Sequence, residues 1–175
     1  MKKLFAVTLL NVAISVTMFY AYTLTGSSAL LAEAFHNASD SICLLFSTLL
    51  TLSKYSKAKA LSALLNGLFV TFASTFVMLR AIRGNVTGGD VIAKVSAVAL
   101  LINAVGWALL RSDDLSLRAM RLHLANDSLF SGIVIVAGLA VSKGLVFVDR
   151  LVAIMISTYM LVHGLKIVLE SLRLM

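Results

Sequence analysis

Six long apolar segments, separated by short breaks, restrict the fold of this chain more than any other feature. A helix needs about 20 predominantly apolar residues to cross the hydrocarbon core of a bilayer, and each segment is long enough. Because backbone groups in lipid must be paired internally, such segments become helices. We therefore predict an all-α integral membrane protein with six transmembrane helices. They run over residues 4–24, 28–53, 60–79, 91–110, 117–141 and 147–169.

The composition argues against a soluble domain. Of 175 residues, 60% are hydrophobic and 13% are charged, and the mean hydropathy is +0.99. Soluble domains carry about 25% charged residues. No hydrophilic stretch is long enough for a second domain, so residues 1–175 are predicted to form a single transmembrane domain. The net charge of +7 comes from Lys and Arg scattered at the segment ends, which indicates contact with lipid headgroups and not with nucleic acid.

The positions of the basic residues predict the orientation. With the N-terminus in the cytoplasm, positive charge concentrates on the cytoplasmic side, as the positive-inside rule requires. We expect both termini to be cytoplasmic and the membrane to be a bacterial inner membrane. Lys94 lies one turn inside the fourth segment and is expected to reach the far interface. The cytoplasmic set is Lys2, Lys3, Lys54, Lys57, Lys59, Arg111, Arg118, Arg121, Lys166 and Arg173, and the opposite set is Arg80, Arg83, Lys143 and Arg150.

Two of the predicted helices contain the same His-x-x-x-Asp spacing. His36 and Asp40 lie in the second segment, and His123 and Asp127 lie in the fifth. Residues four apart share one face of a helix. An Asp at the centre of a membrane helix costs about 2.5–3.5 kcal/mol on insertion scales, so two copies indicate a function. Because the two helices run antiparallel, these four residues are candidate ligands of one tetrahedral metal site.

The ligand types favour particular metals. Imidazole nitrogens with carboxylate oxygens suit zinc and cobalt, whereas all-oxygen sites suit magnesium and manganese. The single cysteine, Cys43, has an apolar context that is typical of a buried structural residue. Since ligands must be deprotonated before they bind metal, protons and metal compete for the site, which makes metal/proton antiport physically reasonable.

Other polar residues in the segments have structural or open interpretations. His163 has no acidic residue at helical spacing on its N-terminal side and is interpreted as interfacial or packed. Glu33 could line the exit path or bind a proton, and we favour polar surroundings near the membrane edge. Asp149 suits the N-terminus of the last helix. Asn and Gly residues within the spans are expected to bond or pack between helices: Asn11, Asn66, Asn103, Gly67, Gly106, Gly132 and Gly138.

Two stretches resemble the cation diffusion facilitator family. Gly26-Ser-Ser-Ala-Leu-Leu-Ala-Glu-Ala-Phe-His-Asn-Ala-Ser-Asp-Ser41 is similar to the second transmembrane helix of that family, and Arg121 to Gly132 is similar to the fifth. The resemblance implies a divalent cation/proton antiporter that exports metal from the cytosol. It implies ligands at His36, Asp40, His123 and Asp127, with zinc as substrate and cadmium or cobalt accepted. It also implies that helices one, two, four and five surround the site, with three and six as a separate pair.

The sequence departs from the family in several places. Family members commonly carry a cytosolic metal-binding C-terminal domain that helps them dimerise, whereas this sequence ends at Met175, just past the sixth segment. The resemblance therefore covers the membrane domain only, and a homodimer is left open. The loop between the fourth and fifth segments contains no histidine, and residues 54–59 contain no carboxylate or imidazole. Regulation through these parts is not expected.

Two other functions compete with transport. A membrane metalloenzyme would keep an open metal position and a general base, but four ligands fill this site and Glu33 is the only candidate base. A scaffold would use the polar pairs only to hold helices together, at about 0.6 kcal/mol each. We expect no enzyme activity and no prosthetic group. The expected partners are a divalent metal ion, protons and the lipid bilayer.

Overall fold

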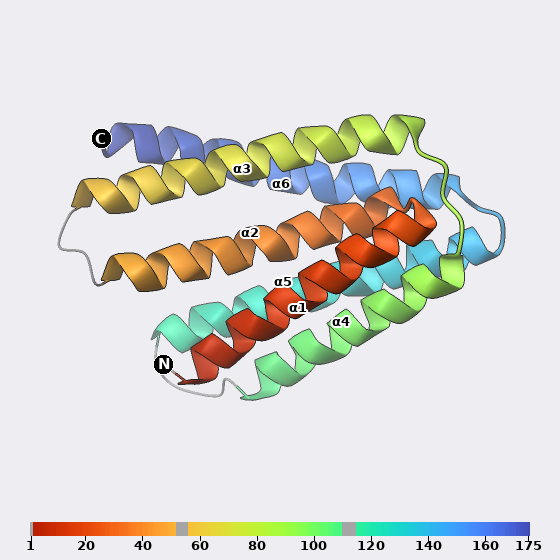
Figure 1. Cartoon of the computed structure of the whole chain (residues 1–175), viewed down its shortest axis with the longest axis horizontal. Coiled ribbons are helices and arrows are strands. Elements are labelled where there is room, and N and C mark those ends of the chain that lie inside the picture. Colours follow the sequence, from red (N-terminus) through yellow and green to blue (C-terminus); the bar gives the residue numbers. More distant parts are fainter. Residues whose placement is uncertain (1, 52–55, 110–114) are drawn as a thin grey trace.

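The structure is a computed structural model that describes residues 2–51, 56–109 and 115–175, with the side chains of residues 8–42, 60–109 and 121–175. All regular structure in these ranges is helical, as predicted (Figure 1). The predicted break at 111–114, the first part of the predicted break at 54–59, the side chain of Cys43 and the side chains of most predicted cytoplasmic basic residues lie outside the described part. The helices are α1 (Lys2–Thr25), α2 (Ser28–Thr51), α3 (Ser56–Arg83), α4 (Gly89–Leu109), α5 (Leu115–Ser142) and α6 (Phe147–Arg173).

The helix ends lie close to the predicted ends, with the largest differences at α3 and α6. The apolar segment predicted at 60–79 is a helix from Ser56 to Arg83. Arg80 and Arg83 occupy its last turn, where positive charge is favourable beside the carbonyl end of the helix dipole. In the same way, α6 continues past residue 169 to Arg173. Hydropathy alone misses such polar last turns.

Five of the helices are long and apolar enough, over their described residues, to cross a membrane: α1, α3, α4, α5 and α6. Their outward faces are apolar. Val16, Phe72, Leu101, Val136 and Leu151, one on each of these helices, are all more than half exposed. Large side chains of this kind facing outward on every side are typical of a surface in contact with lipid. The remaining helix, α2, carries Glu33, His36 and Asp40 and is not in this set.

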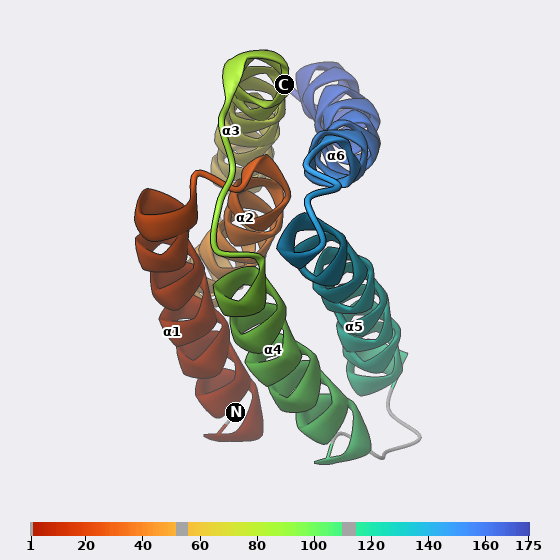
Figure 2. The same ribbon diagram turned by 90° about the vertical axis from the view of Figure 1, so that its right-hand side faces the viewer.

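The helix α2 lies at the centre of the molecule. α4 packs most extensively on α5, α3 on α6, and α1 on α2, while α2 also contacts α3, α6 and α5. Figure 2 shows α2 between the α3–α6 pair and the group of α1, α4 and α5. α3 and α6 are thus each other's main partners, but α2 joins them to the rest. Close approach within that pair occurs where a Cβ on Gly67 would lie 3.1 Å from the Gly164 carbonyl oxygen.

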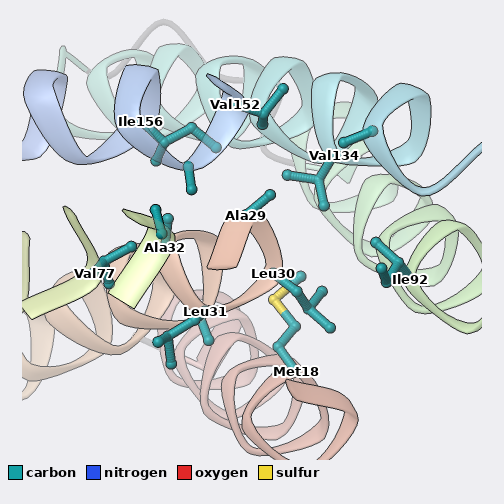
Figure 3. Close-up of a cluster of buried hydrophobic side chains, with 14 of the residues drawn as sticks. Met18, Ala29, Leu30, Leu31, Ala32, Val77, Ile92, Val134, Val152 and Ile156 are labelled. Atoms are coloured by element: carbon teal, nitrogen blue, oxygen red, sulfur yellow. The ribbon is translucent and has the colours of Figure 1, made fainter. Parts of the chain in front are cut away.

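The two ends of the bundle differ. The α1–α2, α3–α4 and α5–α6 connections are short and lie together at one end, which we call the closed end (Figure 1). Both termini lie at the opposite end, which we call the terminal end. A core to which all six helices contribute lies around the first half of α2 (Figure 3). Its labelled members are Met18, Ala29, Leu30, Leu31, Ala32, Val77, Ile92, Val134, Val152 and Ile156.

Asp149 connects the start of α6 to the start of α2 at the closed end, which the sequence did not suggest. It lies in the first turn of α6 and is 1% exposed. Its carboxylate does not cap α6 itself. It accepts hydrogen bonds from the Ser27 hydroxyl (2.5 Å) and from the backbone N–H groups of Ser28 (2.9 Å) and Ala29 (3.4 Å). The first amides of a helix lack partners within the helix. Ser27 caps α2 locally by accepting from the Leu30 N–H at 3.1 Å, and Asp149 adds partners for two further amides from another helix.

Candidate metal centre

The structure brings the four residues of the two His-x-x-x-Asp pairs together. His36 Nε2 lies 3.6 Å from Asp40 Oδ2 and 3.2 Å from Asp127 Oδ1. His123 Nε2 lies 3.1 Å from Asp40 Oδ2 and 3.5 Å from Asp127 Oδ2. Each imidazole nitrogen therefore faces one carboxylate of its own helix and one of the other helix. This arrangement requires α2 and α5 to be antiparallel and adjacent, as they are.

The spacing of these atoms suits a small tetrahedral cation. Donors about 2.1 Å from a tetrahedral zinc lie about 3.4 Å from one another, and the four contacts range from 3.1 to 3.6 Å. Donor atoms of His36, Asp40 and Asp127 all lie within 4.8 Å of one another, and His123, which is outside this group of three, contacts both aspartates through Nε2. Together these residues offer two nitrogens and two carboxylates.

The carboxylates of Asp40 and Asp127 are buried beside the two imidazoles. Their Oδ2 atoms accept no hydrogen bond of good geometry among the described residues, although His123 Nε2 lies 3.1 Å from that of Asp40 and 3.5 Å from that of Asp127. Two carboxylates side by side in a membrane repel each other. A dication among the four groups would offer both oxygens a partner and offset both charges. The arrangement is therefore compatible with a bound metal ion.

A cavity of about 160 Å³ adjoins the four residues, and Asp40 and His123 contribute to its wall. Its other polar lining residues are His36, Ser39, Asn66, Tyr159 and His163. The lining residues of α6 run from Tyr159, whose ring faces that of His36, to His163 and Ile167 on the terminal side. Exposure follows the same direction, since the Asp127 side chain is 1% exposed and that of His123 is 32% exposed. Water and ions can therefore approach the four residues from the terminal end.

The sequence matches the cation efflux transmembrane domain over residues 4–175, which is nearly its whole length. The chain belongs to this family. A cadmium, cobalt and zinc/H(+)-K(+) antiporter of Bacillus subtilis (strain 168) is 27% identical over 173 residues, covering 87% of this chain and 56% of the relative. The antiporter of the same name from Bacillus velezensis is also 27% identical, with 55% of its length covered. The chain thus spans slightly more than half of these curated relatives.

His163 of this cation efflux domain packs on an aromatic ring, in agreement with the interpretation of an interfacial or packed histidine. Its ring lies parallel to that of Tyr159, with centroids 6.3 Å apart, and Tyr159 in turn faces His36 at 6.5 Å. His163 also lines the cavity beside the four residues. The spacing of acidic residues along α6 could not reveal its place at the cavity, because the cavity is also lined by residues of α2, α3 and α5. The four-residue spacing of Tyr159 and His163 does place the two rings on one face of α6.

Glu33 lies inside the cation efflux domain, and the interpretation that it reaches polar surroundings near the membrane edge is wrong. It is 1% exposed. Its Oε2 accepts a hydrogen bond from the Ser96 hydroxyl of α4 at 3.1 Å, and its Oε1 accepts one from the Ser131 hydroxyl of α5. Both serines are fully buried. The two hydroxyls, which sequence reasoning had not connected with Glu33, allow the carboxyl group to be buried.

Proposed function

We propose that this cation efflux domain transports a divalent metal cation, with zinc as the main substrate, through a centre formed by His36, Asp40, His123 and Asp127. The observation that carries the proposal is the spacing of the four donor groups. Each imidazole nitrogen lies 3.1–3.6 Å from an oxygen of both carboxylates, and one oxygen of each carboxylate is buried. Nitrogen and oxygen donors favour zinc, cobalt and cadmium over magnesium.

The transport mode proposed here is exchange of metal for protons, with metal leaving the cytosol. Because the imidazoles and carboxylates must lose protons to bind metal, each occupant displaces the other. The names of the Bacillus relatives, which include both these metals and H(+), support this reading. In this proposal all six helices cross the membrane, including α2. The terminal end is cytoplasmic, so the cavity of 160 Å³ is the cytosolic approach to the centre.

The competing functions fit the geometry less well. A catalytic zinc site keeps one position open for water beside a general base. Here His36, Asp40, His123 and Asp127 offer four donors, and both oxygens of Glu33, the candidate base, accept hydrogen bonds from serine hydroxyls. A scaffold does not require two carboxylates to lie side by side with no Lys or Arg paired to them among the described residues.

Transport into lipid vesicles tests the proposal. Purified protein is reconstituted, zinc is added outside, and an internal fluorescent indicator reports uptake while a proton gradient of either direction is imposed. We expect zinc uptake that follows the proton gradient and is accompanied by proton counterflow. The matched control is Asp90→Asn, since Asp90 is 65% exposed in its ion pair with Lys94 and lies away from the centre. Zinc movement that ignored the gradient would exclude antiport, and absence of zinc binding would exclude the metal centre.

A further inference from the structure

Glu33 is a buried acid that the four-residue centre does not use. It precedes His36 by three residues, so it lies about one helical turn from the centre toward the closed end. It is bonded to Ser96 and Ser131 from two other helices. Among the described residues, no Lys or Arg forms an ion pair with it. The basic residue of α4, Lys94, is 79% exposed and pairs with Asp90 instead.

An ionised carboxylate without a cation is unfavourable in a membrane interior, and neutralisation is the usual outcome. The two serine hydroxyls suit either state of Glu33. A carboxylate accepts a hydrogen bond from each hydroxyl, whereas a carboxylic acid donates to one hydroxyl and accepts from the other. A protonated and an ionised Glu33 can therefore occupy the same place with no change in packing.

We propose that Glu33 is a proton-binding site, separate from the four candidate ligands, that holds a proton while the centre is empty and releases it when a divalent cation binds. The inference rests on the proposed function. The titratable groups that face Glu33 are His36 of its own helix and Asp127 of α5, while α4 presents Ser96. An ionised Asp127 in the empty centre repels a negative charge at Glu33. A dication bound to Asp127 removes this repulsion and stabilises the carboxylate form.

This linkage predicts a proton that does not come from the ligands. At acidic pH the imidazoles and aspartates are themselves protonated, so zinc binding displaces protons mainly from them. Above the range in which imidazoles titrate, about pH 6.5 when unperturbed, the ligands have few protons left to release. Glu33 still holds its proton there because the empty centre is then most negative. Proton release that persists at this higher pH is the signature of Glu33.

The test measures protons released per zinc bound to the full chain in lipid nanodiscs. Calorimetric titrations with zinc are run at several pH values, each in buffers of different ionisation heat. The variants are Glu33→Gln, which keeps a neutral hydrogen-bonding side chain, and the control Asp90→Asn. On the alkaline side we expect the parent and Asp90→Asn to release about one more proton per zinc than Glu33→Gln. Zinc should still bind Glu33→Gln with the parent's stoichiometry, since Glu33 is not a ligand.

A second measurement on the parent does not depend on the folding of Glu33→Gln. Infrared difference spectra recorded on addition of zinc should show loss of a protonated carboxyl band at alkaline pH, and Ser131→Ala should shift that band because it removes a hydrogen bond to Glu33. Equal proton release by the parent and Glu33→Gln, or no loss of a carboxyl band, would overturn the inference while leaving the proposed function in place. Absence of zinc binding by the parent would overturn both.

Discussion

Two stretches of α2 lie in opposite environments. Between residues 29 and 34, Ala29, Leu30, Leu31, Ala32 and Ala34 are at most 2% exposed and pack against neighbouring helices (Figure 3). Between residues 36 and 40, His36 and Asp40 border a cavity that extends toward the terminal end. One helix thus contributes packed residues on one side of the candidate centre and cavity-lining residues on the other. In the proposed transport, release toward the closed end would require residues 29–34 to separate from their neighbours.

The largest effect is expected from a change at the centre itself. Asp127→Asn keeps the shape of the most deeply buried candidate ligand but removes its charge. We expect zinc binding and transport to fall by more than the roughly 10–100-fold that is typical for outer-shell partners of metal sites. Stability without metal should change less than zinc binding, because the substitution keeps the size of the side chain and an oxygen that can accept a hydrogen bond from His36. Isothermal titration and thermal unfolding of the same preparation would measure both, and zinc transport at the parent rate would refute the ligand assignment.

Labelling by thiol reagents would sharpen the contrast between the two ends. In a chain with Cys43 replaced by Ser, a cysteine at Ser39 borders the cavity, whereas one at Ala32 lies in the core of the closed end. We expect a water-soluble maleimide to modify Ser39→Cys rapidly from the terminal side. Ala32→Cys should react slowly from either side, because packed side chains surround it. Comparable rates at the two positions would contradict the sealed closed end.

The sequence predicted some parts of this structure well and others poorly. Hydropathy found the six helices because each apolar run is separated from the next by a short polar or glycine-containing break. The i, i+4 spacing found the four residues of the candidate centre, since a repeated ionisable pair inside apolar helices is costly and indicates a bound ion. The surroundings of Glu33 and Asp149 were missed. Both depend on serines that come from other parts of the chain, and no local pattern relates Asp149 to Ser27, 122 residues away.

Asp149 offers a smaller test of the closed end, based on stability. Asp149→Ala would leave the Ser28 and Ala29 amides without the carboxylate that accepts from them. Unpaired buried groups of this kind cost about 1–3 kcal/mol. We expect a lower unfolding temperature and faster labelling of Ala32→Cys in the same background, while zinc binding at equilibrium changes less. Asp90→Asn serves again as the control, because changes at exposed residues usually stay within about 0.5 kcal/mol. An unfolding temperature equal to that of the parent would show that the interhelical cap does not stabilise the closed end.

The smallest effect is expected at His163, on the open side of the comparison. Its imidazole lines the cavity that leads to the four residues but, unlike that of His123, forms no ion pair with Asp40 or Asp127 among the described residues. His163→Ala should therefore leave the stoichiometry and affinity of zinc at equilibrium close to those of the parent. It should lower the rate at which zinc reaches the four residues, because the substitution removes one imidazole nitrogen that can bind the cation inside the cavity. At low zinc concentration we expect the rate of zinc uptake to fall by a few-fold, at most about 10-fold, which corresponds to about 1.4 kcal/mol. The maximal rate should be retained. Tyr159→Phe is the matched control, since it keeps the ring stacked on His163 and removes only a hydroxyl.

Stopped-flow uptake across a range of zinc concentrations separates the rate at low zinc concentration from the maximal rate. A loss of equilibrium zinc affinity as large as that of Asp127→Asn would instead indicate that His163 is a zinc ligand, and the candidate centre would have to include it.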